Sequence, residues 1–155
     1  GEIQAAALRN TTVAQMDEVK MRILGGYVDE WKKLTKSNAA PVIGVGIVHS
    51  EYLAKNPEAV VKFVAGMKEA TDWGGRNTAR VAEILQKSAN LKPDDAQAYA
   101  KQWNAIYVTS FEPADVAMMK KMAEIFKGAG SMKKDLPDSA FATEPYTRAK
   151  PRFGK

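Results

Sequence analysis

The sequence predicts an α/β fold, with a mixed sheet of few strands, flanking helices and then a C-terminal helical run. The segment Val42–Val48 is an unbroken apolar run of strand length, which is typical of a strand covered on both faces. Two shorter apolar segments, Ile3–Leu8 and Met21–Leu24, enclose a helix-like stretch, and this β-α-β order favours a parallel pair. Apolar residues recur at helical spacing over most of the remaining chain.

The elements before the central strand are short. Asn10 or Thr11 is expected to cap the helix between the first two strands, because both side chains can accept a bond from a free backbone N–H. Gly25 and Gly26 are expected to close the second strand. The segment 27–36 has an apolar side, and its pattern leaves open whether it is a helical turn or a loop.

A long helix is predicted directly after the central strand region. Asn56 suits its cap and Pro57 its first position, since proline has no N–H to leave unpaired there. Four apolar residues fall at i, i+3, i+4 and i+7 and predict one buried stripe, namely Val60, Phe63, Val64 and Met67. The pair Gly74–Gly75 is expected to end the helix after Trp73.

Three further helices follow from start and stop signals. Asn77 is expected to cap the first, and Pro93 to begin the second after the break at 90–93. The third begins between Ser110 and Pro113 and ends at Gly128. The polar, proline-containing tail from residue 132 is expected to be extended and either to dock or to fray.

Composition bounds the class of protein. The chain has 155 residues, 45% of them hydrophobic and 26% charged, which is ordinary for a globular domain. It has no cysteine, which excludes disulfides and thiol chemistry within it. The net charge of +5 fits either attraction to anions or a lysine-rich solvated surface. Acidic residues interrupt the basic ones along the helices, which argues against a nucleic-acid interface.

The best candidate for a binding site follows the first predicted strand. Arg9 can contact a carboxylate, sulfonate or nitrate through two N–H groups, and Asn10 and Thr11 add neutral donors beside a helix N-terminus. The alternative is a capped helix with an exposed arginine. Tyr27, after the second strand, either stacks on a ligand or packs against the protein.

Motifs for catalysis and metal binding are missing. His49 is the single histidine, and it has no carboxylate at a metal-binding spacing. The sequence has no GxSxG, no Walker phosphate loop and no cysteine nucleophile. These observations predict a protein that is not an enzyme and that carries neither a cofactor nor a metal.

The order of several segments resembles a known family. The stretch His-Ser-Glu-Tyr-Leu-Ala-Lys-Asn-Pro-Glu-Ala-Val from His49, the helix end Ala-Thr-Asp-Trp at Trp73 and the opening Gly-Glu-Ile-Gln-Ala-Ala-Ala are its main features. Together they resemble the C-terminal half of the periplasmic solute-binding proteins of ABC importers, in the nitrate, taurine, aliphatic-sulfonate and thiamine-precursor group. The resemblance implies a two-lobed fold, with residues 1–50 in the second lobe, 51–131 returning toward the first and 132–155 as an extended tail.

The function that the resemblance implies is solute capture outside the cytoplasm. A small anionic or polar solute would bind between two lobes and be passed to a membrane permease, with Arg9, Asn10, Thr11 and Tyr27 on the cleft wall. The chain has Leu8-Arg-Asn where the family often has Trp-Glu-Pro, so the solute class stays open. The alternatives are an enzyme on the same scaffold, of the desulfinase or pyrimidine-synthase kind, or a helical interaction or dimerisation module. Self-association is also expected, because the chain resembles half of a fold.

Overall fold

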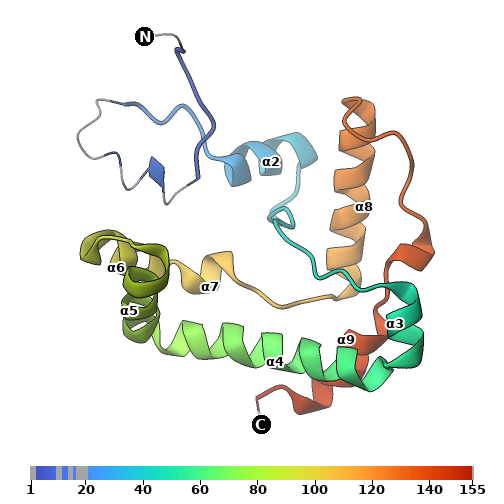
Figure 1. The fold of residues 1–155 in the computed structure, drawn as a ribbon. Helices are drawn as coiled ribbons and strands as arrows, with labels where there is room; N and C mark the ends of the chain where they lie inside the picture. Colours follow the sequence, from blue (N-terminus) through green and yellow to red (C-terminus); the bar gives the residue numbers. More distant parts are fainter. Residues whose placement is uncertain (1–2, 10–11, 14–15, 17–20, 155) are drawn as a thin grey trace. The chain divides into compact units, whose positions relative to one another are not determined.

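The structure is a computed structural model that describes residues 3–9, 12–13, 16 and 21–154. All regular elements within these residues are helices and none is a strand, so the α/β prediction is wrong (Figure 1). In chain order they are α2 Tyr27–Thr35, α3 Ser50–Lys55, α4 Pro57–Arg76, α5 Thr78–Ala89, α6 Pro93–Lys101, α7 Trp103–Ile106, α8 Pro113–Gly128, η1 Asp138–Ala140, α9 Glu144–Ala149 and η2 Lys150–Arg152.

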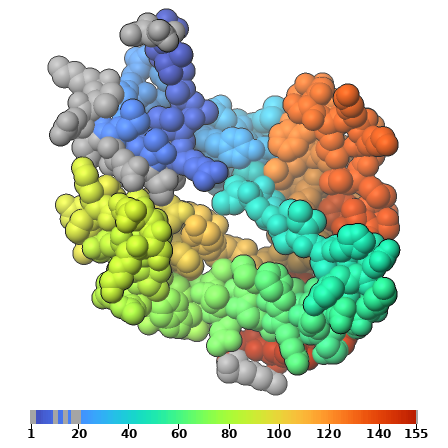
Figure 2. Space-filling view, in the orientation of Figure 1, coloured from blue at the N-terminus to red at the C-terminus, as the bar shows by residue number. Residues whose placement is uncertain are grey.

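The three predicted strands have irregular or extended backbone without a ladder among the described residues. The clearest case is the segment Val42–Val48, which we call the apolar segment. Its Ile43, Val45 and Ile47 are 70%, 63% and 94% exposed, and Figure 2 shows the stretch uncovered on the face in view. A β-strand is stable only when neighbouring strands satisfy its N–H and C=O groups and cover its side chains. An apolar run supplies the propensity for a strand but not the partner.

The helix starts agree better with the sequence. α4 begins at Pro57, and the Asn56 carbonyl accepts a bond from the Ala59 N–H at 3.1 Å. α5 begins after Asn77, as predicted, but the Asn77 side-chain amide donates to the Trp73 carbonyl at 2.8 Å instead of capping α5. Asn90 ends α5 with φ 52°, a left-handed conformation that asparagine tolerates better than most residues.

The glycine pair in α4 does not end the helix, which continues to Arg76. A Cβ on Gly74 would lie 2.6 Å from Cζ2 of Trp103, and a Cβ on Gly75 would collide with the Asn104 side chain. The Trp103 indole N–H also donates to the Thr71 carbonyl at 2.8 Å. These glycines therefore allow α7 to lie close against α4, a role that the sequence pattern did not distinguish from a helix stop.

The chain divides into two compact units. Unit 1 comprises Gly1–Ile23 and Ala70–Val108, and unit 2 comprises Leu24–Glu69 and Thr109–Lys155. The core of unit 1 lies where α5 packs on α6, and it consists of small side chains. Its buried members are Val81, Ala82, Ala96 and Ala100, with Leu85, Leu91 and Trp103 partly buried against them.

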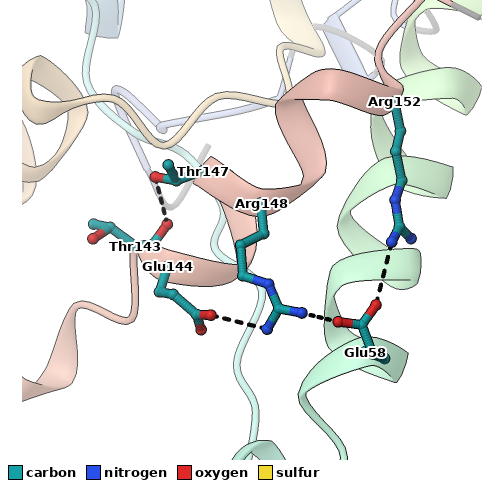
Figure 3. A network of polar contacts seen from close by, with 6 residues as sticks. All are labelled: Glu58, Thr143, Glu144, Thr147, Arg148 and Arg152. Carbon is teal, nitrogen blue, oxygen red and sulfur yellow. Dashed lines mark hydrogen bonds and ion pairs between the residues drawn. The ribbon is translucent and has the colours of Figure 1, made fainter.

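Unit 2 buries few large side chains. Trp31 on α2, Val61 on α4 and Tyr146 on α9 are its main buried residues. The tail, predicted to be extended, contains η1, α9 and η2. Arg148 and Arg152 from this tail both pair with Glu58 of α4 (Figure 3). In the described ranges, no helix has both the length and the apolar character needed to cross a membrane.

Candidate functional site

Arg9, the residue with the strongest prediction for ligand binding, lies in unit 1 and is exposed. Its carbonyl accepts a bond from the Val13 N–H at 3.0 Å, and Thr12 and Val13 are helical. Arg9 therefore precedes a helical turn, although the strand predicted before it has irregular backbone. Asn10 and Thr11, the two proposed neutral donors, lie outside the described residues.

Three aromatic residues gather on α6 and the segment after it. The Tyr99 and Tyr107 hydroxyls are 2.9 Å apart, and their rings meet edge to face at a centroid distance of 6.4 Å. The Trp103 ring lies 4.3 Å from that of Tyr107, tilted by 36°. Tyr99 lies on α6, Trp103 begins α7 and Tyr107 follows the end of α7, so the three rings meet across the junction of two helices. Aromatic pairs of this geometry stabilise one another beyond their buried area.

Burial raises the pKa of Tyr99 to about 12, and the hydrogen bond to Tyr107 acts in the same direction. The positive charge of Arg9 opposes this rise in pKa, because it favours the ionised phenolate. Arg9 and Tyr99 belong to the same unit, and the effect of Arg9 on Tyr99 is electrostatic. We call Arg9, Tyr99 and Tyr107 the arginine–tyrosine cluster.

The chemistry of this cluster suits an anion. The guanidinium of Arg9 offers several N–H donors in a planar fork, which matches a carboxylate or sulfonate. Either hydroxyl of the bonded tyrosine pair can be the donor in their mutual bond, so the other hydroxyl keeps its proton for a further acceptor. The cluster therefore combines one fixed positive charge with a neutral donor at the surface of unit 1.

Tyr27 is not part of this cluster. It is the first residue of α2, belongs to unit 2 and is 60% exposed. His49 precedes α3, where its carbonyl accepts a bond from the Leu53 N–H at 3.0 Å, and its side chain makes no cap bond. Within the described part of the chain, no group of three or more His, Cys, Asp or Glu residues is arranged to hold a metal ion.

The sequence interpretation missed the two tyrosines as site residues. The spacing of Tyr99 and Trp103 is that of one buried helix face, and nothing in the sequence singles out Tyr107. The one signal in the sequence is the recurrence of an aromatic residue every four positions, at Tyr99, Trp103 and Tyr107. A face buried in the core would carry aliphatic side chains, whereas Tyr99 and Tyr107 each add a hydroxyl group to this aromatic series.

Comparison with known proteins adds no relative. No family model matches the chain, and searches of curated proteins and of solved structures found no match.

Proposed function

We propose that this chain is a helical interaction module whose apolar faces are covered by a second copy of the chain. The proposal is carried by one observation: unit 2 exposes side chains that the sequence pattern predicts to be buried. Ile43, Val45 and Ile47 lie exposed on the apolar segment, and Phe63 and Met67 lie exposed on α4. Both sets belong to the same unit.

The size of this exposure sets the energy available for association. Phe63 is 61% exposed, and full burial of a phenylalanine side chain is worth about 1.5–3 kcal/mol. Single exposed hydrophobic residues are normal on any protein, but contiguous apolar surface marks an interaction site. The apolar segment carries five aliphatic side chains and no charge between Val42 and Val48. Its backbone groups have no hydrogen bond to another described residue, and such groups can pair with another extended strand.

The test is the mass of the purified chain as a function of its concentration, measured by sedimentation equilibrium. We expect a reversible dimer. Phe63→Ser should raise its dissociation constant about tenfold, because a loss of ~1.4 kcal/mol of burial energy corresponds to that factor. Lys62→Ser is the matched control, since it introduces serine at the preceding position of α4, which is also exposed.

Both variants introduce serine into α4, but only Phe63→Ser removes exposed apolar surface, so only it should weaken association. Lys62→Ser should therefore dimerise like the unchanged chain. A chain that stays monomeric at every accessible concentration, or variants that weaken the dimer equally, would contradict the proposal.

A second candidate function is favoured by the arginine–tyrosine cluster. Arg9 is exposed, belongs to the same unit as the Tyr99–Tyr107 hydroxyl pair and acts electrostatically on Tyr99, which supports binding of a small anionic solute. The resemblance of the sequence to solute-binding components of ABC importers favours the same ligand class. Under this proposal the chain acts outside the cytoplasm and delivers its solute to a membrane permease. The two proposals rest on different units, the dimer on unit 2 and the anion site on unit 1, so each can be tested separately.

Isothermal titration with taurine, methanesulfonate and nitrate tests the second candidate. A charge-assisted contact is worth about 1.5–3 kcal/mol, so Arg9→Ala should weaken a bound anion by at least about tenfold. Arg22→Ala is the control, because Arg22 is a second exposed arginine of unit 1. Equal affinity in all three proteins, or no binding of any probe, would refute the assignment of Arg9.

A further inference from the structure

The C-terminal residues 144–153 form a segment that we call the strap, made of α9, η2 and Phe153. All of its contacts described here lie within unit 2. Arg148 and Arg152 reach Glu58 near the start of α4, and Arg148 also pairs with Glu144 of its own helix at 2.9 Å (Figure 3). The strap therefore brings two guanidinium groups to one carboxylate of the body.

A second anchor lies at the start of α8. Glu112 accepts bonds from Lys150 Nζ at 2.5 Å and from the Tyr146 hydroxyl at 3.2 Å. The Asp115 side chain accepts the Glu112 backbone N–H at 2.8 Å, which fixes this residue at the helix start. The Lys150 ammonium also lies 5.3 Å from the centre of the Tyr146 ring. Both anchors have the same polarity, with the cation on the strap and the carboxylate on the body.

The strap also contributes apolar side chains to its contact with the body. Pro145, Tyr146 and Ala149 are buried, and the Phe153 ring packs 5.6 Å from that of Tyr146. The two helices of the strap have six and three residues, which is too short for either to persist alone in water. The strap therefore keeps its structure only while it is docked.

The ion pairs are open to solvent. The side chains of Glu58, Arg148 and Arg152 are each about half exposed, as are those of Glu112 and Lys150. Exposed pairs are screened by salt, since the Debye length falls from about 10 Å at 0.1 M to about 3 Å at 1 M. The grouping of several such pairs in one short segment makes the docking of that segment sensitive to ionic strength.

We propose that the strap is an electrostatic latch, which ion pairs to Glu58 and Glu112 hold closed and which salt opens while the rest of unit 2 stays folded. Opening uncovers two acidic side chains and the buried face of α9 together. The released segment 147–152 carries three positive charges, so the closed latch pairs a basic peptide with the carboxylates of Glu58 and Glu112.

Hydrogen exchange of the intact chain, read by mass spectrometry, tests the latch. We expect exchange in residues 144–153 to rise at least about threefold between ~0.05 and ~1 M sodium chloride, while α8 keeps its protection. Glu58→Gln should show the faster exchange already at low salt and should respond less to added salt. Arg152→Gln should act in the same direction from the other side of the contact.

Glu124→Gln is the matched control, because Glu124 pairs only with Lys121 on α8, at 2.9 Å, among the contacts described. Its strap should behave as in the unchanged chain. Strap exchange that ignores both salt and Glu58→Gln would show that apolar contacts hold the segment, and would overturn the proposal. Exchange that rises equally in the strap and in α8 would show general unfolding, and would overturn it as well.

Discussion

The two units hold together by different means. Unit 1 packs small side chains, with Ala96 and Ala100 fully buried and Trp103 seated on Gly74. Unit 2 relies on exposed ion pairs for its C-terminal strap, while large apolar side chains such as Phe63 stay at its surface. Close packing responds to changes of volume, whereas surface charge pairs respond to salt and pH. One chain therefore uses both close packing, which is sensitive to changes of side-chain volume, and surface ion pairs, which are sensitive to salt and pH.

The largest expected effect is on the free energy of unfolding, and it differs between two glycines of α4, one in each unit. Gly74→Ala should lower the free energy of unfolding by about 1–3 kcal/mol, because the new Cβ would meet the Trp103 ring. Gly66→Ala, in the unit 2 part of α4, meets nothing within 4 Å and should raise it by about 0.5–1 kcal/mol through helix propensity. Urea unfolding followed by circular dichroism measures both changes. Equal stabilisation by the two alanines would show that α7 does not lie close against α4.

The next effect concerns alkaline stability of unit 1. Because the pKa of Tyr99 is raised from 10.0 to about 12, the folded state holds this proton more tightly than the unfolded state. Its contribution is complete below pH 10 and is lost as pH rises through about 12. Absorbance at the tyrosinate band should show the late titration of Tyr99. Tyr107→Phe should move that titration to lower pH, since it removes the hydrogen bond; an unmoved titration would contradict the pairing.

The smallest effect concerns acid stability of unit 2. The hydrogen bond from Lys150 lowers the pKa of Glu112, the Tyr146 bond adds to this, and the Asp115 charge opposes it. The contribution of Glu112 is therefore present above pH 4.5 and is lost as pH falls through its lowered value. Hydrogen exchange of the strap at decreasing pH should show this loss, and Glu112→Gln should remove the part of the pH dependence that Glu112 contributes. Glu124→Gln should keep it.

Helix positions could be predicted from the sequence because their signals are local. Pro57, Pro93 and Pro113 each stand at the first position of a helix, and this preference depends only on the backbone of the residue itself. The strands could not be predicted in the same way. The run Val42–Val48 has the composition of a buried strand, but a strand also needs a partner, and the described residues provide none.

The candidate site was predictable only in part. Arg9 is exposed before a helical turn, and its role in ligand binding stays a prediction. The contribution of Tyr99 and Tyr107 depends on how α6 gives way to α7 at Gln102, which periodicity alone does not show. Gly74 and Gly75 failed as a stop signal for a related reason. Their meaning depends on Trp103, which lies far along the sequence but against the same helix.

The three tryptophans give the molecule built-in optical labels. Trp31 is 4% exposed, and its Nε1 finds no hydrogen-bond partner among the described residues, so water cannot relax around its excited state and its emission should be shifted to the blue. Trp103 is partly buried and hydrogen-bonded, and Trp73 is open to solvent. Acrylamide should quench Trp73 first and Trp31 last. Single-tryptophan variants therefore allow unfolding of unit 2 to be followed by Trp31, and that of unit 1 by Trp103, without any added dye.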